Sequence, residues 1–281
     1  MRLSLFTQIN PLTMIRRALA ASGARDEQPR QEEFVQARRE AEAEDAEAAK
    51  SELISIVSHE LRTPLTALQG FSELLLVREC SEEERVLWTT KINEEAKRLA
   101  KILDDMLTVS RIERGVVRLK LQPIAIEEAI RDALALFSAD SNDHRFIVDV
   151  DALGLAVSAD RERLTQVIEN LVSNAVRYSP GGGTIRIAAS ESDGHAVVSV
   201  SDQGIGIPAE ELPKLFSRFH RIDTPDRVAI RGTGLGLYIA QRLVAMQSGT
   251  ISVESEVGQG STFTFTMPLA RSETPALTGA R

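Results

Sequence analysis

The sequence contains a single cysteine, Cys80, and no set of Cys and His residues spaced as in a zinc site. One cysteine cannot form a disulfide within the chain, so a disulfide-stabilised secreted domain is excluded and a reducing cytoplasm is expected. The sequence also lacks the roughly 18 uninterrupted apolar residues that a membrane span needs, so we expect no transmembrane segment. The apolar N-terminal stretch is broken by polar residues and by Arg16 and Arg17, unlike a signal peptide.

An excess of positive charge is missing too, because the formal net charge is -8. Binding to a phosphate backbone requires a basic face, so we expect no nucleic-acid partner. What the chain does have is 281 residues, of which 43% are hydrophobic. That is enough for two domains that each bury a core.

The two ends of the chain read differently from its middle. Residues 1–30 are polar without a sustained period, and residues 271–281 contain Pro275 and Gly279, so both are expected to be disordered. Residues 31–50 consist of strong helix formers with few large apolar groups. They predict a helical, coiled-coil-like lead-in to the next segment.

Residues 51–115 predict a dimerising two-helix hairpin. Apolar residues recur every three or four positions over 51–77 and again over about 85–114, with a polar turn at 78–84 between them. One hairpin cannot cover its own wide apolar face, so self-association into a four-helix bundle is expected. The two stripes are Leu53, Val57, Leu61, Leu65, Leu68, Phe71 and Leu75 in the first helix and Trp88, Ile92, Ala96, Leu99, Leu103 and Met106 in the second.

The first helix carries the stretch VSHELRTPLTAL, residues 57–68, which contains both His59 and Pro64. The leucine stripe places His59 on the side facing water. A proline in a helix interior costs about 3 kcal/mol or more, so the helix could end near Pro64. The apolar spacing continues through Pro64 without a break in phase, which favours a helix that runs on with a local bend. A histidine in isolation is more often a solvated side chain than a catalyst.

Residues 116–270 predict a second domain of the α+β class, a sheet with helices on one face. Alternating strands are expected at 145–150, 184–189, 195–202, 250–255 and 261–268, with an Asp-Gly hairpin turn at 193–194. Helices are expected at about 126–138, from the N-cap Asp160 to about Tyr178, and at about 235–247.

Three polar motifs in this second domain suggest a nucleotide site. Asn170 and Asn174 share one helical face, where amide oxygens could complete the shell of a phosphate-bound Mg²⁺, although a merely polar surface is equally compatible. Asp202 ends a strand and could accept a hydrogen bond from an adenine amine. The glycines of RGTGLGLYIA open onto a helix and could cradle an anion, without the ending of a P-loop or the preceding strand of a Rossmann turn. The basic segment before them reads as a cover over phosphates.

Taken together and in this order, the motifs resemble those of sensor histidine kinases of two-component signalling, over roughly residues 50–269. SHELRTPL is similar to the phosphoacceptor box, ENLVSNA to the N box, and LFSRFHR to the phenylalanine box; DQGIGI and GTGLGL are similar to the two glycine boxes. The resemblance implies an α/β-sandwich ATP-binding domain of the gyrase, heat-shock-protein and MutL type after the bundle.

The resemblance also implies the reaction and its residues. A cytoplasmic homodimer would use ATP and Mg²⁺ to phosphorylate His59, with Glu60 as neighbouring base, and would pass the phosphoryl group to an Asp of a response regulator. Thr63 would orient water if the chain also acts as a phosphatase. Asn170 would contact phosphate and Asn174 would bind the metal. The other implied nucleotide contacts are Arg177, Tyr178, Asp202, Gly204, Gly206, Phe219, Arg221, Gly232, Thr233, Gly234, Leu235 and Gly236.

Two other functions remain as alternatives. ATP-hydrolysing clamps of the same superfamily commonly have a Glu where Asn170 stands, and an amide cannot take a proton from water; Glu169, next to it, would point elsewhere on the helix. A catalytically silent docking scaffold would be expected to have lost the Asn, Asp and Gly positions, and all are present. The sequence does not decide whether a subunit phosphorylates itself or its twin.

Overall fold

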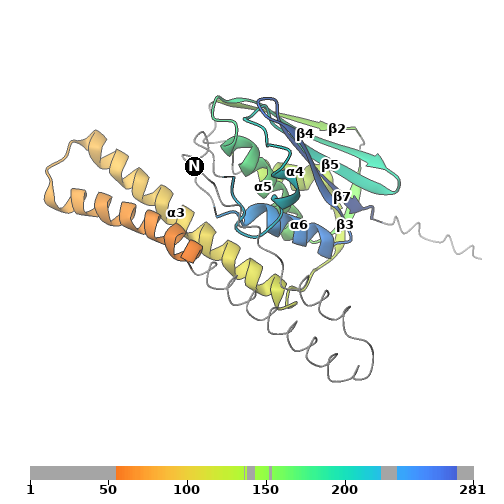
Figure 1. The fold of residues 1–281 in the computed structure, drawn as a ribbon, viewed down its shortest axis with the longest axis horizontal. Coiled ribbons are helices and arrows are strands. Elements are labelled where there is room, and N and C mark those ends of the chain that lie inside the picture. The colour runs from red at the N-terminus through yellow and green to blue at the C-terminus, as the bar shows by residue number, and fades with distance from the viewer. Residues whose placement is uncertain (1–54, 136, 138–142, 152–153, 223–232, 271–281) are drawn as a thin grey trace, which may run out of the picture. The chain divides into compact units, whose positions relative to one another are not determined.

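The computed structural model describes residues 55–135, 137, 143–151, 154–222 and 233–270. From Ile56 onward the described residues belong to one compact unit (Figure 1). The predictions for residues 1–30, 31–50 and 271–281 lie outside the described residues, and the domain boundaries stay predictions. In the described part of the chain, no helix is both long enough and apolar enough to cross a membrane.

The first helix of the hairpin is continuous over 55–77, straight through Pro64. The alternative that the helix ends at the proline is therefore wrong. Pro64 itself is buried, whereas His59 is exposed, as the leucine stripe predicts. The hydroxyl of Thr63 donates to the carbonyl of His59 at 3.3 Å and that of Thr66 to the carbonyl of Arg62 at 2.9 Å, so threonines on both sides of the proline add bonds to the helix backbone.

The second helix of the hairpin, α3, spans Glu82–Glu113 and begins three residues before the predicted start. Ser81 caps it in a complete capping box, in which the Ser81 hydroxyl accepts from the Glu84 N–H and the Glu84 carboxylate accepts from the Ser81 N–H. The pattern Ser-x-x-Glu at residues 81–84 is the sequence signature of such a capping box and could have located the start of the helix. The prediction had placed this acidic run in the turn.

The predicted apolar stripes of the hairpin are only partly covered. Trp88 is buried, but Leu65 is 48% exposed and Leu103 is 47% exposed. Further along α3, Leu107 is 53% exposed. One copy of the chain therefore leaves large apolar side chains on the hairpin in contact with solvent, as expected if a second copy covers them.

The second part of the unit contains a five-stranded sheet in the order β2-β4-β5-β7-β6. The strands are β2 (His144–Val150), β4 (Gly183–Ser192), β5 (His195–Ser201), β6 (Ile251–Glu256) and β7 (Gly260–Pro268). β2 pairs with β4 in parallel, and the remaining pairs are antiparallel. Asp193 and Gly194 form the tight β4–β5 turn with φ of 50° and 74°, which confirms the predicted hairpin.

Three helices pack against one face of this sheet, α4 (Ile126–Leu134), α5 (Arg161–Arg177) and α6 (Gly236–Met246) (Figure 1). The buried positions of β5 alternate, as expected for a sheet with one covered face. Ile168 and Leu171 of α5, Leu243 of α6 and Phe265 of β7 are completely buried between the two layers. The predicted α+β class is confirmed.

The sequence patterns missed a second, two-stranded sheet. β1 (Gln122–Ala125) pairs antiparallel with β3 (Ala156–Ala159). Each strand has four residues, too few for alternation to be recognised. A short 3-10 helix, η1 (Leu212–Lys214), was also not predicted. The N-cap of α5 was predicted correctly, since the Asp160 carboxylate accepts from the Arg163 N–H at 3.2 Å.

Candidate nucleotide site

A cavity of about 550 Å³ lies between α5, the start of α6, the ends of β5 and β7, and the middle of α3. Most of the predicted nucleotide contacts line it, although they come from separate motifs. The predicted residues in its wall are Glu60, Asn170, Asn174, Arg177, Tyr178, Asp202, Gly206, Arg221, Thr233, Gly234 and Gly236. A volume of this size is within the usual range for a small-molecule site.

One end of the cavity is built around Asp202, which is 9% exposed. Its Oδ1 accepts hydrogen bonds from the Gly204 N–H at 2.8 Å and the Ser261 N–H at 3.2 Å. The second oxygen, Oδ2, can therefore accept from a ligand amine. Burial raises the pKa of Asp202, while the two backbone bonds oppose that rise. The N–H groups of Gly204 and Ser261 therefore fix the direction of the carboxylate.

Two glycines bring backbone against this cavity where no other residue fits. Gly206 has a φ of +66°, and a Cβ placed on it would lie 1.9 Å from the Glu256 carbonyl oxygen. Gly234 has a φ of +68°, and its Cβ would lie 2.7 Å from the carbonyl carbon of Phe219. At both positions neighbouring backbone lies too close for any side chain, so only glycine fits.

α6 begins at Gly236, two residues after Gly234, with Leu235 as its N-cap. The first N–H groups of a helix have no partner within that helix and carry its positive dipole end. Thr233 and Gly236 line the cavity beside them. The predicted anion cradle therefore fits a phosphate group. Gly232 lies outside the described residues.

Asn170 and Asn174 occur on α5 as predicted, and both line the cavity. Asn170 is 5% exposed and donates from Nδ2 to the Gly236 carbonyl at 3.2 Å, which ties α5 to the cradle. Asn174 is half-buried. In the part of the chain that the structure describes, no three His, Cys, Asp or Glu residues are grouped to hold a metal. An amide oxygen such as that of Asn174 is a ligand that Mg²⁺ accepts together with phosphate and water oxygens.

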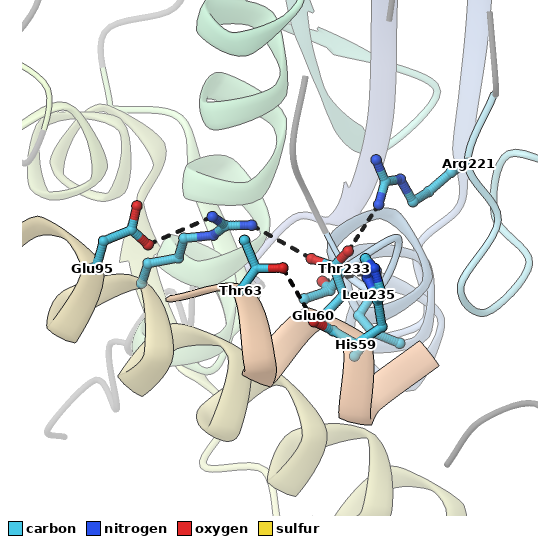
Figure 2. A network of polar contacts seen from close by, with 8 residues as sticks. His59, Glu60, Thr63, Glu95, Arg221, Thr233 and Leu235 are labelled. Carbon is cyan, nitrogen blue, oxygen red and sulfur yellow. Dashed lines mark hydrogen bonds and ion pairs between the residues drawn. The ribbon is translucent and has the colours of Figure 1, made fainter. Parts of the chain in front are cut away.

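The hairpin supplies the opposite wall through Glu60, which is 7% exposed. Its Oε1 lies 2.9 Å from Nη1 of Arg221 and its Oε2 lies 3.5 Å from Nη2 of Arg98 (Figure 2). The resemblance implied Glu60 as a base beside His59. In this structure the Glu60 carboxylate pairs with two arginines, Arg98 of α3 and Arg221 of the segment after η1. His59, one residue away, is exposed and is not among the residues that line the cavity.

Other predicted contacts lie behind the wall. Leu235 is completely buried, and Phe219 packs against the core while its N–H donates to the Gly234 carbonyl at 3.1 Å. Gly204 does not line the cavity, but its N–H donates to the Asp202 carboxylate. Thr63, the predicted phosphatase residue, also lies outside the lining, and its hydroxyl donates to the His59 carbonyl. In this structure Phe219 and Leu235 support the cradle and do not face the ligand space.

Sequence reasoning missed several lining residues. Lys97, Arg98 and Lys101 reach the cavity from α3, and Ser261 and Phe263 reach it from β7. Helical spacing shows that the three basic residues share a part of α3, but no local pattern shows that a second domain faces them. Ser261 lies in β7, and no local pattern shows that this residue of the strand faces the cavity.

Two family models match the chain. The model described as His Kinase A (phospho-acceptor) domain matches residues 49–115, and the model described as Histidine kinase-, DNA gyrase B-, and HSP90-like ATPase matches residues 159–271. Their order is the order of the hairpin and the α+β domain.

Curated relatives include the circadian input-output histidine kinase CikA of Synechococcus elongatus, 36% identical over 80% of this chain and 31% of that protein. The sensor histidine kinase WalK of Bacillus subtilis is 34% identical over 81% of this chain and 38% of that protein. The chain thus spans only about a third of the length of these relatives.

Solved structures are also similar. Full-length ShkA in complex with AMPPNP aligns with a TM-score of 0.57 and 30% identity over 79% of this chain and 46% of that one. Histidine kinase ThkA in complex with the response regulator protein TrrA aligns with a TM-score of 0.59 and 26% identity over 85% of this chain and 67% of that one. With the phosphoacceptor hairpin, the nucleotide cavity and these likenesses, the chain belongs to the sensor histidine kinases of two-component systems.

Proposed function

We propose that this chain transfers the γ-phosphoryl group of ATP to His59 and then to an aspartate of a response regulator. The observation that carries the proposal is the position of Glu60. It directly follows the exposed His59, and it lines the same cavity as Asn170 and Asp202. The acceptor segment and the nucleotide-binding side chains thus border a common space.

The residues of the cavity would divide the work of holding ATP. Asp202 would accept a hydrogen bond from the adenine amine, a group that guanine lacks at that place. The cradle at Gly234 and the first turn of α6 would bind phosphate oxygens. Asn174 would bind Mg²⁺, which when bound neutralises charge on the phosphates. Arg177 and Arg221 would add positive charge at the same wall.

His59 would act as the nucleophile, because its ring is exposed and it directly precedes Glu60, which lines the cavity. The unprotonated ring nitrogen attacks phosphorus while the bond to the leaving nucleotide oxygen breaks. The proton on the other ring nitrogen needs an acceptor, and Glu60 is the adjacent carboxylate. Glu60 would have to exchange Arg98 or Arg221 for the imidazole, so we propose that the structure represents a state before transfer.

The second transfer would use the same exposed position of His59. A ring at the surface of a helix can meet the aspartate of a separate receiver domain. The solved complex of ThkA with its response regulator supports this kind of partner. Because the reaction consumes ATP, we place this part of the protein in the cytoplasm.

We also propose a homodimer formed through the hairpin. Leu65, Leu103 and Leu107 are each about half exposed on the hairpin helices in a single copy. Burying the exposed half of such a side chain against a second hairpin would contribute about 1 kcal/mol for each leucine. The match to a phosphoacceptor domain agrees with this arrangement.

The proposal is tested by incubating the chain with Mg²⁺ and ATP labelled in the γ-phosphate. We expect acid-labile label on the wild type, none on His59→Gln, and normal labelling of the control His195→Gln, whose ring lies at the β4–β5 turn. Label that survives the His59 substitution, or that is stable in acid, contradicts the proposal. Transfer is then measured to a panel of purified receiver domains and to their phosphoacceptor Asp→Asn variants.

A further inference from the structure

One lysine of the hairpin touches the nucleotide-binding helix directly. Nζ of Lys101, on α3, lies 3.4 Å from Oδ1 of Asn170, 69 residues later in the chain. Nζ also lies 3.0 Å from Oδ1 of Asp105, one turn further along α3. The ammonium is therefore held at the cavity wall by two oxygens from two different domains.

Lys101 lies close to the phosphate cradle. The same Asn170 side chain that contacts Nζ through its oxygen donates from Nδ2 to the carbonyl of Gly236, in the first turn of α6. The Asn170 side-chain amide thus contacts both Lys101 and the first turn of α6. Lys101 and Gly236 both line the cavity, with the ammonium on the hairpin side.

The charges around Lys101 suit an anion that arrives with the ligand. Asp105 is its acidic partner, but that side chain is 6% exposed, and burial raises the pKa of Asp105 while Lys101 opposes the rise. The lysine side chain is 51% exposed, so its ammonium can move without unfolding the helix. Two of the other cations that line the cavity, Arg98 and Arg221, are paired with Glu60.

We propose that Lys101 is a positioning residue that binds the terminal phosphate of ATP from the hairpin side. An oxyanion at the cradle would give the ammonium a stronger partner than the neutral amide of Asn170. Lys101 would then hold the γ-phosphate between the two domains, on the side where His59 is presented. This inference rests on the proposed function, because it assigns a contact within the same nucleotide site.

The test compares a nucleotide that has the γ-phosphate with one that lacks it. Binding of the non-hydrolysable imido analogue of ATP and of ADP is titrated with Mg²⁺ in the full chain. Three variants are used: Lys101→Met, Lys101→Arg and the control Lys91→Met, which removes an exposed lysine paired with Glu94 on the same helix. We expect Lys101→Met to weaken the ATP analogue about tenfold and ADP less than twofold, the arginine to restore most of the loss, and the control to bind as wild type.

If the wild type binds both nucleotides, each other outcome overturns the inference. Equal weakening of both nucleotides would mean that Lys101 only shapes the site, and unchanged binding would mean that it does not reach the ligand. Tighter binding of the ATP analogue by Lys101→Met would mean that the lysine hinders nucleotide binding. Failure of the wild type to bind either nucleotide would instead refute the proposed function.

Discussion

Nη1 of Arg221 lies 2.9 Å from Oε1 of Glu60, across 161 residues of sequence. Glu60 follows the proposed phosphoacceptor, whereas Arg221 belongs to the segment that bounds the nucleotide cavity. The pair is partly buried, with the Glu60 side chain 9% exposed. The contact links the acceptor helix to the ATP-binding domain, and it keeps the carboxylate away from the role of base.

The first prediction concerns Glu60. Glu60→Gln keeps the shape of the side chain and removes the proton acceptor, so we expect autophosphorylation to slow by about 10²-fold, at the low end for general bases. Affinity for ATP should change less than about threefold, because Glu60 has no proposed contact with the nucleotide. Single-turnover labelling and nucleotide titration measure the two quantities. The control Glu73→Gln changes an exposed residue of the same helix. A normal rate in Glu60→Gln would assign the base to another residue.

The second prediction separates binding from stability at Asp202. Asp202→Asn preserves an oxygen acceptor for the Gly204 and Ser261 N–H groups but can present a donor to the adenine amine. We expect ATP affinity to fall about 10–100-fold, as for a lost hydrogen bond to a charged group. Retained affinity would show that adenine is bound elsewhere.

The same variant predicts a pH dependence with a defined sign. Because burial raises the pKa of Asp202 above its ordinary 3.8, the native state holds this proton more tightly than the unfolded chain. The contribution of Asp202 to stability is fully present below that value and is lost as pH rises through the raised pKa. The free energy of unfolding of Asp202→Asn relative to wild type should thus increase from about pH 4 to neutrality in urea titrations. A constant difference would contradict the burial effect.

A third prediction concerns the cradle at Gly234. Gly234→Ala adds a Cβ that meets backbone at 2.7 Å in a residue with positive φ. We expect at least tenfold weaker ATP binding, since the loop must move. Gly258→Ala is the matched control, because Gly258 has a φ of +81° but open space around its Cβ position. It should lose about 1–2 kcal/mol of stability for the left-handed conformation and bind ATP normally. Similar ATP binding by both variants would show that the collision is harmless.

A fourth prediction addresses assembly. Glutamates at Leu103 and Leu107 put charge on the exposed apolar part of α3 and should raise the dissociation constant of the dimer more than 100-fold. Val257→Glu, at a 62% exposed position in the β6–β7 turn, is the control. Sedimentation equilibrium measures the oligomeric state. A wild type that sediments as a monomer, or a double variant that remains dimeric, would refute dimerisation through this surface.

A fifth prediction concerns phosphatase activity. Thr63→Ala should leave labelling of His59 within about twofold and should slow dephosphorylation of a phosphorylated receiver domain by tenfold or more, since its hydroxyl would orient water. Thr66→Ala removes the same kind of hydroxyl-to-carbonyl bond one turn along and should have no effect on either reaction. If Thr63→Ala dephosphorylates the receiver domain at the wild-type rate, Thr63 has no such role.

The caps, turns and apolar spacings that determine the helices and strands involve residues close together in the sequence, and they could be recognised from the sequence directly. Asp160 caps α5, Asp193 and Gly194 turn the β4–β5 hairpin, and the spacing through Pro64 belongs to a continuous helix. Each is a relation between residues a few positions apart, where backbone geometry fixes what the neighbours can do. The order of the motifs then indicated the family.

The partners within the cavity were decided by the tertiary structure. Lys101 meets Asn170 across 69 residues and Glu60 meets Arg221 across 161, and no periodicity relates such positions. These contacts depend on how the hairpin packs against the α+β domain, which is a property of surfaces assembled from many elements. The sequence by itself determined which elements form and which motifs they carry, whereas packing decided that Glu60 faces two arginines and that a lysine of the hairpin contacts Asn170 of α5.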